Sequence, residues 1–216
     1  MKKTSAPLKI LSYNVLDGFQ RDEAVIATFM NWVDSVKPEI VALQEMNFFD
    51  QKSLELLANK MKFPYAVLLK ETGYPVALLS KFPIVAVKKV TDNMSHGFIR
   101  ARILDYNIVV LHLTPWITEK KIDEITTVLA EIDNIPPDEK IMVMGDFNSL
   151  SFNDRIMHGQ KLIDAEIILE KRMQKAILVN GKIDYTVCNK MEENGFVDSW
   201  TLFNKTPESS CPTLKY

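Results

Sequence analysis

The sequence predicts an α/β fold in which two β-sheets pack face to face with helices outside them. Two observations carry this prediction. Amphipathic helical stripes alternate with buried-strand candidates near the N-terminus, and a series of short strands, one more helix and one more strand follow. A chain of 216 residues is long enough to bury the core of one such fold, so we expect residues 1–216 to form a single domain.

Apolar spacing and capping residues predict the first elements. Leu8–Asn14 is expected to form a strand. Asp22 can cap a helix that continues to Val36, because apolar residues recur there at helical spacing. Ile40–Leu43 is expected to form the next strand and Ser53–Met61 a short helix. This order is typical of a βα unit.

The middle of the chain consists of short apolar runs separated by turn residues, which predicts a β meander. Its strands are expected at Tyr65–Leu69, Val76–Ser80, Ile84–Val90, Phe98–Leu104 and Ile108–Leu113, with a hairpin connection at Asp105-Tyr106-Asn107.

The last third of the chain predicts fewer regular elements. A helix is expected over Glu119–Asp133, before the strand that ends in Asp146. Gln160–Lys175 is expected to be helical in part, and Asn180-Gly181 to form a turn. A short helix is expected to end near Asn194, followed by a return to the core.

Polar side chains follow four of the predicted strands. After the apolar run 141–144 and Gly145, Asp146 and Asn148 occupy alternate positions and so project to the same side of an extended backbone. Asn14, Glu45 and His112 follow three other apolar runs. One such stretch could be a strand followed by an Asx-turn. The repetition predicts a site, because sites in open α/β sheets form at the carboxyl ends of strands.

These motifs, in this order, resemble one family. Tyr13-Asn14, Leu43-Gln44-Glu45, His112-Leu113 and Gly145-Asp146-Phe147-Asn148 are similar to motifs of the endonuclease/exonuclease/phosphatase superfamily, which includes deoxyribonuclease I, abasic-site endonucleases, sphingomyelinases and inositol polyphosphate phosphatases. The resemblance is strongest as far as Ser149. It implies a four-layer α/β sandwich of the deoxyribonuclease I type and a divalent-metal-dependent phosphoester hydrolase, most simply a phosphodiesterase.

Residue chemistry and the resemblance together suggest a role for each candidate. Glu45 is a hard oxygen donor, so we expect it to bind Mg²⁺, with Mn²⁺ as the alternative. Asn14 either offers its oxygen to the same metal or holds Glu45. The resemblance assigns His112 to the phosphate, and Asp146 and Asn148 to positioning the nucleophile and stabilising the charged phosphorus centre. The competing interpretations are a surface glutamate, turn asparagines and a core histidine.

The two other histidines, His96 and His158, are expected to have no role. His96 falls in a predicted loop, and His158 falls in a polar stretch. Three histidines without a close pair argue against a zinc site.

One family motif is missing. The family closes with a Ser-Asp-His segment whose histidine is assigned to activating water, and no histidine follows His158 here. We therefore expect the chain to stop short of the family's final strands. The alternative is that Asp184 substitutes for the family's aspartate. Besides a phosphodiesterase, a nuclease of the same family and an inactive domain that binds a phosphorylated ligand stay open.

Composition limits the partners and the location. The net charge is −2 and there is no basic run, so the sequence gives no electrostatic footprint for tight, non-specific binding to nucleic acid. This argues mildly against a processive nuclease and does not exclude a small phosphoester substrate. Cys188 and Cys211 form neither a metal motif nor a disulfide framework.

No stretch is apolar for the length of a membrane span, and the first residues lack the apolar core of a signal peptide. We expect a cytoplasmic protein, or a secreted or periplasmic one if a signal peptide was removed. No partner protein is predicted, and the phosphoester substrate is a small molecule, a phospholipid headgroup or a nucleic acid.

Overall fold

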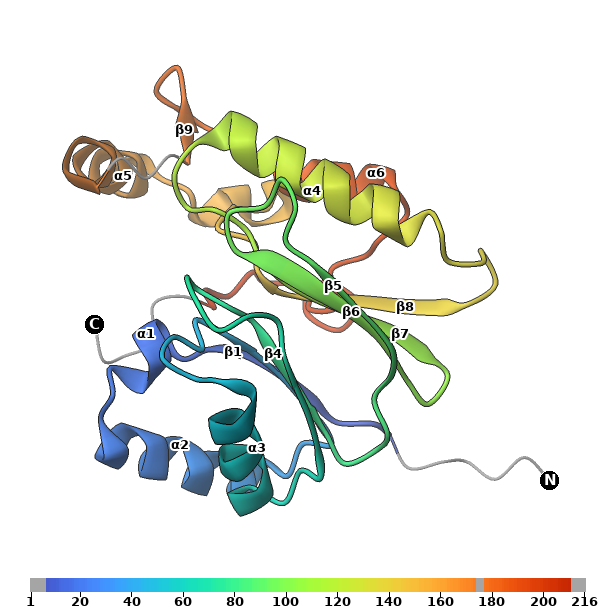
Figure 1. Ribbon diagram of the computed structural model, residues 1–216. Coiled ribbons are helices and arrows are strands. Elements are labelled where there is room, and N and C mark those ends of the chain that lie inside the picture. The colour runs from blue at the N-terminus through green and yellow to red at the C-terminus, as the bar shows by residue number, and fades with distance from the viewer. Residues whose placement is uncertain (1–6, 174–176, 211–216) are drawn as a thin grey trace. The chain divides into compact units, whose positions relative to one another are not determined.

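The structure, a computed structural model, describes residues 7–173 and 177–210 (Figure 1). The predicted helix end at Lys175 and the cysteine at position 211 lie outside the described residues. The chain divides into two compact units. The first contains the described residues up to Leu113 and Ile135–Phe147, and the second contains Thr114–Asn134 and the described residues from Asn148 on. Whether residues 1–216 act as a single domain stays a prediction.

The first unit contains two mixed sheets of four strands. One has the order β1 (Ile10–Asn14), β2 (Ile40–Gln44), β4 (Ala77–Ser80) and β3 (Tyr65–Leu68), and the other the order β5 (Val85–Val90), β6 (Gly97–Ile103), β7 (Tyr106–His112) and β8 (Lys140–Asp146). In each sheet one pair is parallel, β1 with β2 and β7 with β8, and the other pairs are antiparallel. The predicted α/β sandwich is confirmed.

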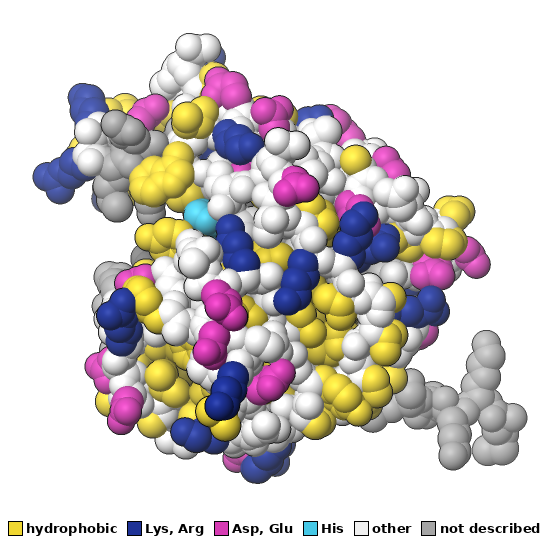
Figure 2. All heavy atoms as spheres, viewed as in Figure 1, with side chains coloured by type: hydrophobic (Ala, Val, Ile, Leu, Met, Phe, Trp, Pro, Cys, Tyr) yellow, Lys and Arg dark blue, Asp and Glu magenta, His cyan; other side chains and the backbone are white. Residues whose placement is uncertain are grey.

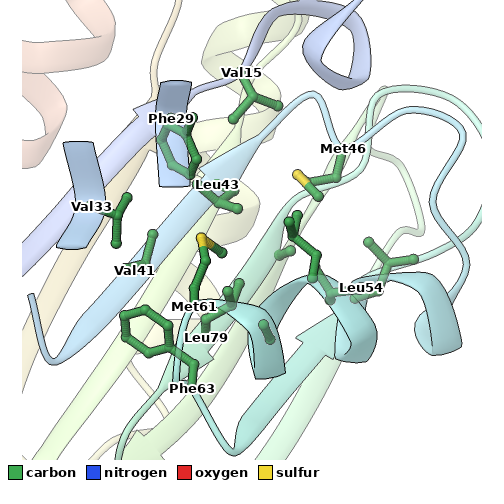
Figure 3. Close-up of a cluster of buried hydrophobic side chains, with 14 of the residues drawn as sticks. Val15, Phe29, Val33, Val41, Leu43, Met46, Leu54, Met61, Phe63 and Leu79 are labelled. Atoms are coloured by element: carbon green, nitrogen blue, oxygen red, sulfur yellow. The ribbon is translucent and has the colours of Figure 1, made fainter. Parts of the chain in front are cut away.

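Alternation along β2 explains how the sheets pack. Val41 and Leu43 point into a core shared with the helices α2 (Glu23–Val36) and α3 (Gln51–Lys60), as Figure 3 shows. Ile40 and Ala42 point into the other core, which includes residues of β6 and β7. Because successive side chains of a strand face opposite ways, a strand that is apolar throughout is buried on both faces.

Capping residues fix the helices of this unit. The carboxylate of Asp22 accepts from the backbone N–H of Ala24 at 2.8 Å, which confirms the predicted start of α2. Helix α3 begins two residues before the predicted Ser53. The reason is a capping box, in which Asp50 and Ser53 each bind the other's backbone N–H.

The prediction that the five middle strands form one meander is wrong, because these strands are divided between the two sheets. β3 and β4 pair with each other and join the sheet of β1 and β2, whereas β5, β6 and β7 form an antiparallel series in the second sheet. The chain changes sheets between β4 and β5. The hairpin connection also differs from the predicted one. Tyr106 and Asn107 belong to β7 and pair with β6, so the turn lies at Leu104-Asp105.

The outer strand β5 is irregular. Its pairing with β6 shifts register between Val85 and Lys88, and Ala86 has a φ of 50°. Five of its six residues, including Val85, Val87 and two lysines, are exposed. A bulge of this kind bends a strand and increases its twist.

The second unit contains α4 (Thr118–Ile132), a 3₁₀ helix (Phe152–Met157), α5 (Gln160–Met173), the two-stranded β9 (Leu178–Val179) and β10 (Lys182–Ile183), and α6 (Thr186–Glu193). The turn at Asn180-Gly181 is confirmed, because β9 and β10 pair around it. The predicted return to the core after α6 is wrong, because the side chain of Val197 is 63% exposed. No helix within the described ranges has the length and apolar character needed to cross a membrane.

Candidate active site

Three of the predicted site residues meet at the carboxyl ends of their strands. The side-chain Nδ2 of Asn14, the last residue of β1, donates to Glu45 Oε1 at 2.9 Å and to Asp146 Oδ2 at 3.0 Å. Glu45 directly follows β2, and Asp146 ends β8. All three side chains are half-buried. One amide therefore joins two carboxylates delivered by the two sheets of the same unit.

The orientation of the Asn14 amide is set by a backbone contact. Its Oδ1 accepts from the N–H of Leu16 at 2.9 Å, so the NH₂ group faces the carboxylates. Oxygen and nitrogen of an amide are assigned from such contacts. In this orientation Asn14 holds Glu45. Ligation through Oδ1 requires the amide to rotate and to give up the bond from Leu16.

The donor set fits a hard divalent cation. Two carboxylates and an amide oxygen are the ligand types that Mg²⁺ takes, and Mg²⁺ uses only one or two protein carboxylates and keeps its waters. The Asn14 NH₂, which carries a partial positive charge, already bridges Glu45 and Asp146. In the described part of the chain no group of three or more His, Cys, Asp and Glu residues could hold a metal.

Gly145 is required by the backbone approach of β8 to β7. Its φ is 140°, and a Cβ atom built on it would lie 1.9 Å from the carbonyl oxygen of Leu111. Only glycine fits there. This approach puts Asp146 beside His112 as its register partner, and the N–H of Leu113 donates to the carbonyl of Asp146 at 2.9 Å.

His112 is buried, and the structure stacks a second histidine on it. The ring centroids of His96 and His112 are 4.4 Å apart at 26°, and Tyr74 meets the two rings edge-on. Burial, followed by the neighbouring His112 and Lys70, lowers the pKa of His96 to about 3. His96 lies in a loop directly before β6, as predicted, but its contact with His112 was not expected from the sequence. Sequence reasoning missed it because the contact arises from the pairing of Gly97 with His112.

Asn148 belongs to the second unit. Its φ is 46°, and its carbonyl accepts from Lys121 Nζ at 2.7 Å. Lys121 is only 2% exposed, and Glu124, one turn further along α4, is fully buried and accepts from the N–H of Thr114 at 2.8 Å. The spacing of these two residues along the apolar face of α4 was an available sequence signal.

Asp184 and His158 have local partners in the second unit. The carboxylate of Asp184 accepts from the N–H of Thr186 at 3.1 Å and from its hydroxyl at 2.9 Å, where α6 begins. The Nδ1 of His158 lies 3.0 Å from the hydroxyl of Tyr185, and the two rings stack. Burial lowers the pKa of His158.

Comparison with known proteins gives one family match and a set of similar structures. The profile of the Endonuclease/Exonuclease/phosphatase family matches residues 11–209. No curated protein matches the chain in sequence.

Among solved structures, an AP endonuclease from Archaeoglobus fulgidus has 16% sequence identity and a TM-score of 0.54, with 68% of this chain and 60% of that chain covered. TDP2 from D. rerio, complexed with a single-strand DNA product, has 17% identity and a TM-score of 0.54, with 70% and 65% covered. The 3′ phosphatase NExo from Neisseria, bound to a product DNA hairpin, has 17% identity and a TM-score of 0.53, with 68% and 61% covered. The chain thus spans less than two thirds of each of these structures. At this identity the likeness shows the fold.

Proposed function

Since this chain belongs to the Endonuclease/Exonuclease/phosphatase family, we propose that it is a divalent-metal-dependent phosphodiesterase. The observation that carries the proposal is the contact of Asn14 with both Glu45 and Asp146. A polar cluster at the carboxyl ends of core strands is costly unless it binds a ligand. Hard oxygen donors in this cluster favour Mg²⁺, with Mn²⁺ as the alternative.

Each residue has a proposed part in an in-line attack of water on phosphorus. Glu45 is the metal ligand, and Asn14 holds it in place or joins it as a ligand. A divalent cation held by these residues would neutralise charge on the phosphate oxygens. His112 donates to the phosphate, and Asp146 and Asn148 position the attacking water and stabilise the charged phosphorus centre. The oxygen of the water bonds to phosphorus as the bond to the leaving alcohol oxygen breaks, and the proton of the water passes to solvent or to that leaving oxygen.

A nuclease is the second candidate. Two of the similar structures hold DNA products, which favours it. The net charge of −2 favours a smaller phosphodiester. On the face drawn in Figure 2, Lys and Arg side chains are interspersed with Asp and Glu side chains. The third alternative is an inactive domain of the same fold that binds a phosphorylated ligand.

The test is hydrolysis of bis-p-nitrophenyl phosphate with Mg²⁺, with Mn²⁺ and with a chelator. We expect the parent to turn over only with metal, and Glu45→Gln to lower kcat/KM about 100-fold, because the amide keeps the size of Glu45 and removes its charge. Glu39→Gln is the matched control, since Glu39 is another half-buried glutamate, directly before β2, whose carboxylate accepts from a backbone N–H. Equal rates for Glu45→Gln and the parent would contradict the metal role. Metal-dependent binding of phosphate esters without turnover would favour the inactive domain.

A further inference from the structure

Residues 16–21, which follow Asn14 and include the short helical turn α1 (Leu16–Phe19), wind with left-handed dihedrals. Their φ values are all positive, 51° at Leu16, 48° at Asp17, 63° at Gly18, 59° at Phe19, 56° at Gln20 and 56° at Arg21. L-residues other than glycine rarely adopt this conformation, and runs of it are rarer still, because Cβ crowds the following carbonyl. We call residues 16–21 the left-handed turn. Such strain persists only where the surrounding structure enforces it.

Contacts with the segment after β2 hold the left-handed turn. The N–H of Gly18 donates to the carbonyl of Glu45 at 2.7 Å. A Cβ atom on Gly18 would lie 2.1 Å from the carbonyl oxygen of Asn47, so the two backbones touch there. The guanidinium of Arg21 lies 3.4 Å from the ring centroid of Phe48.

The side chain of Asn47 holds the left-handed turn through a hydrogen bond to Asp17. Its side chain is 6% exposed, and its Nδ2 donates to Asp17 Oδ1 at 2.6 Å. Its Oδ1 has no hydrogen-bond partner among the described residues. A buried carbonyl oxygen left without a partner destabilises the folded state. Core stability alone therefore does not explain an asparagine at position 47.

The left-handed turn directs two backbone N–H groups at the candidate metal site. Leu16 N donates to Asn14 Oδ1, and Asp17 N donates to Glu45 Oε2 at 2.8 Å. We infer that the left-handed turn orients Glu45 for a divalent cation and that Asn47 is the positioning residue that holds the turn. This inference rests on the metal role proposed above for Glu45.

The expected size of the effect follows from the behaviour of groups that orient metal ligands. Removing a partner that orients a ligand lowers metal affinity by about 10- to 100-fold. The N–H of Asp17 can donate to Glu45 only while the left-handed turn keeps its dihedral angles. The amide of Asn47 binds the side chain of Asp17 and so helps to keep those angles.

The first measurement is Mn²⁺ binding by electron paramagnetic resonance, which needs no turnover. We expect Asn47→Leu to lower Mn²⁺ affinity about tenfold. Asn107→Leu is the matched control, because Asn107 is also buried in this unit and donates to a carboxylate, Glu139 Oε2, at 2.7 Å, at the opposite end of β7 from His112. The control is expected to bind Mn²⁺ within about twofold of the parent.

A second pair of variants decides the question if Asn47→Leu does not fold. Asp17→Asn and Asp17→Ala both remove the charge of an exposed side chain, and only Asn keeps an oxygen for Asn47 and tolerates the left-handed conformation. We expect Asp17→Ala to bind Mn²⁺ about tenfold more weakly than Asp17→Asn.

The outcomes separate this inference from the proposed function. A parent that binds no Mn²⁺ would overturn both. A parent that binds Mn²⁺, with Asn47→Leu matching Asn107→Leu, or with Asp17→Ala matching Asp17→Asn where Asn47→Leu is unfolded, would overturn the inference alone.

Discussion

Burial keeps His96 neutral beside His112. Its side chain is 7% exposed, and its pKa is lowered from 6.5 to about 3, chiefly by burial. Between pH 6.5 and about pH 3, His96 is protonated in the unfolded chain and neutral in the folded chain. Stability contributed by neutral His96 is therefore complete above about pH 6.5 and is lost as the pH falls toward 3.

We expect the free energy of unfolding to fall by about 2 kcal/mol between pH 6.5 and pH 5 on account of His96. His96→Phe keeps an aromatic ring against His112 and cannot be protonated, so its stability is expected to depend less on pH. Urea unfolding of both proteins across this range measures the difference. Parallel pH curves for the parent and the variant would show that His96 is not the residue responsible.

Single residues also mark where sequence reasoning succeeds. Asn14, Glu45 and Asp146 could be predicted as neighbours, because each ends or follows a largely apolar strand of a parallel pair and the strands of such a pair end at the same edge of a sheet. His96 and Asn47 could not, because they lie in loops whose contacts depend on the register of strands far away in the sequence.

At the level of elements, α4 combines an apolar stripe with three buried charged side chains, those of Lys121, Glu124 and Glu131. Ile125 and Leu129 are buried as the spacing predicts, and Lys121 and Glu124 share that face. Buried charges of this kind are retained only where they are paired or hydrogen-bonded. Lys121 binds the carbonyl of Asn148, the residue that we propose helps to position water.

We expect Lys121→Met to lower kcat for the diester about tenfold with little change in KM, because the Asn148 carbonyl loses its donor. Lys121→Arg, which can still donate, is expected to recover part of the loss. Leu129→Ala is the control, since it weakens the same helix without touching the Asn148 contact. If Lys121→Met and Leu129→Ala have the same kcat, the contact does not act on catalysis.

The elements themselves were predicted unevenly. α2, α4 and β8 begin and end within about two residues of the prediction, because the period of apolar residues is a local signal, to which α2 adds the cap of Asp22. The division of the meander between two sheets was missed, because which strands pair is decided by tertiary packing. The left-handed turn was missed because most of its residues disfavour that conformation.

At the level of the whole molecule, net charge distinguishes the two proposed activities, a phosphodiesterase that acts on small substrates and a nuclease. A protein that neutralises many phosphates loses about 10³–10⁵ in affinity between roughly 50 and 200 mM salt. The net charge of −2 and the mixed charges in Figure 2 favour few such contacts.

We therefore expect binding of single-stranded DNA to be weak and to change less than about tenfold over this salt range. Fluorescence anisotropy of a labelled oligonucleotide, with Glu45→Gln used to prevent cleavage, measures it. A steep salt dependence would move the nuclease ahead of the phosphodiesterase that acts on smaller substrates.

The irregular outer strand β5 has a consequence for solubility. A straight strand with exposed valines at the border of a sheet is a template on which a strand of another molecule can add by backbone pairing. The register shift between Val85 and Lys88 breaks the straight run, and Lys88 and Lys89 would place like charges against each other in a pairing of two copies. The border that β5 forms is therefore expected to resist pairing with a strand of a second copy in concentrated solution.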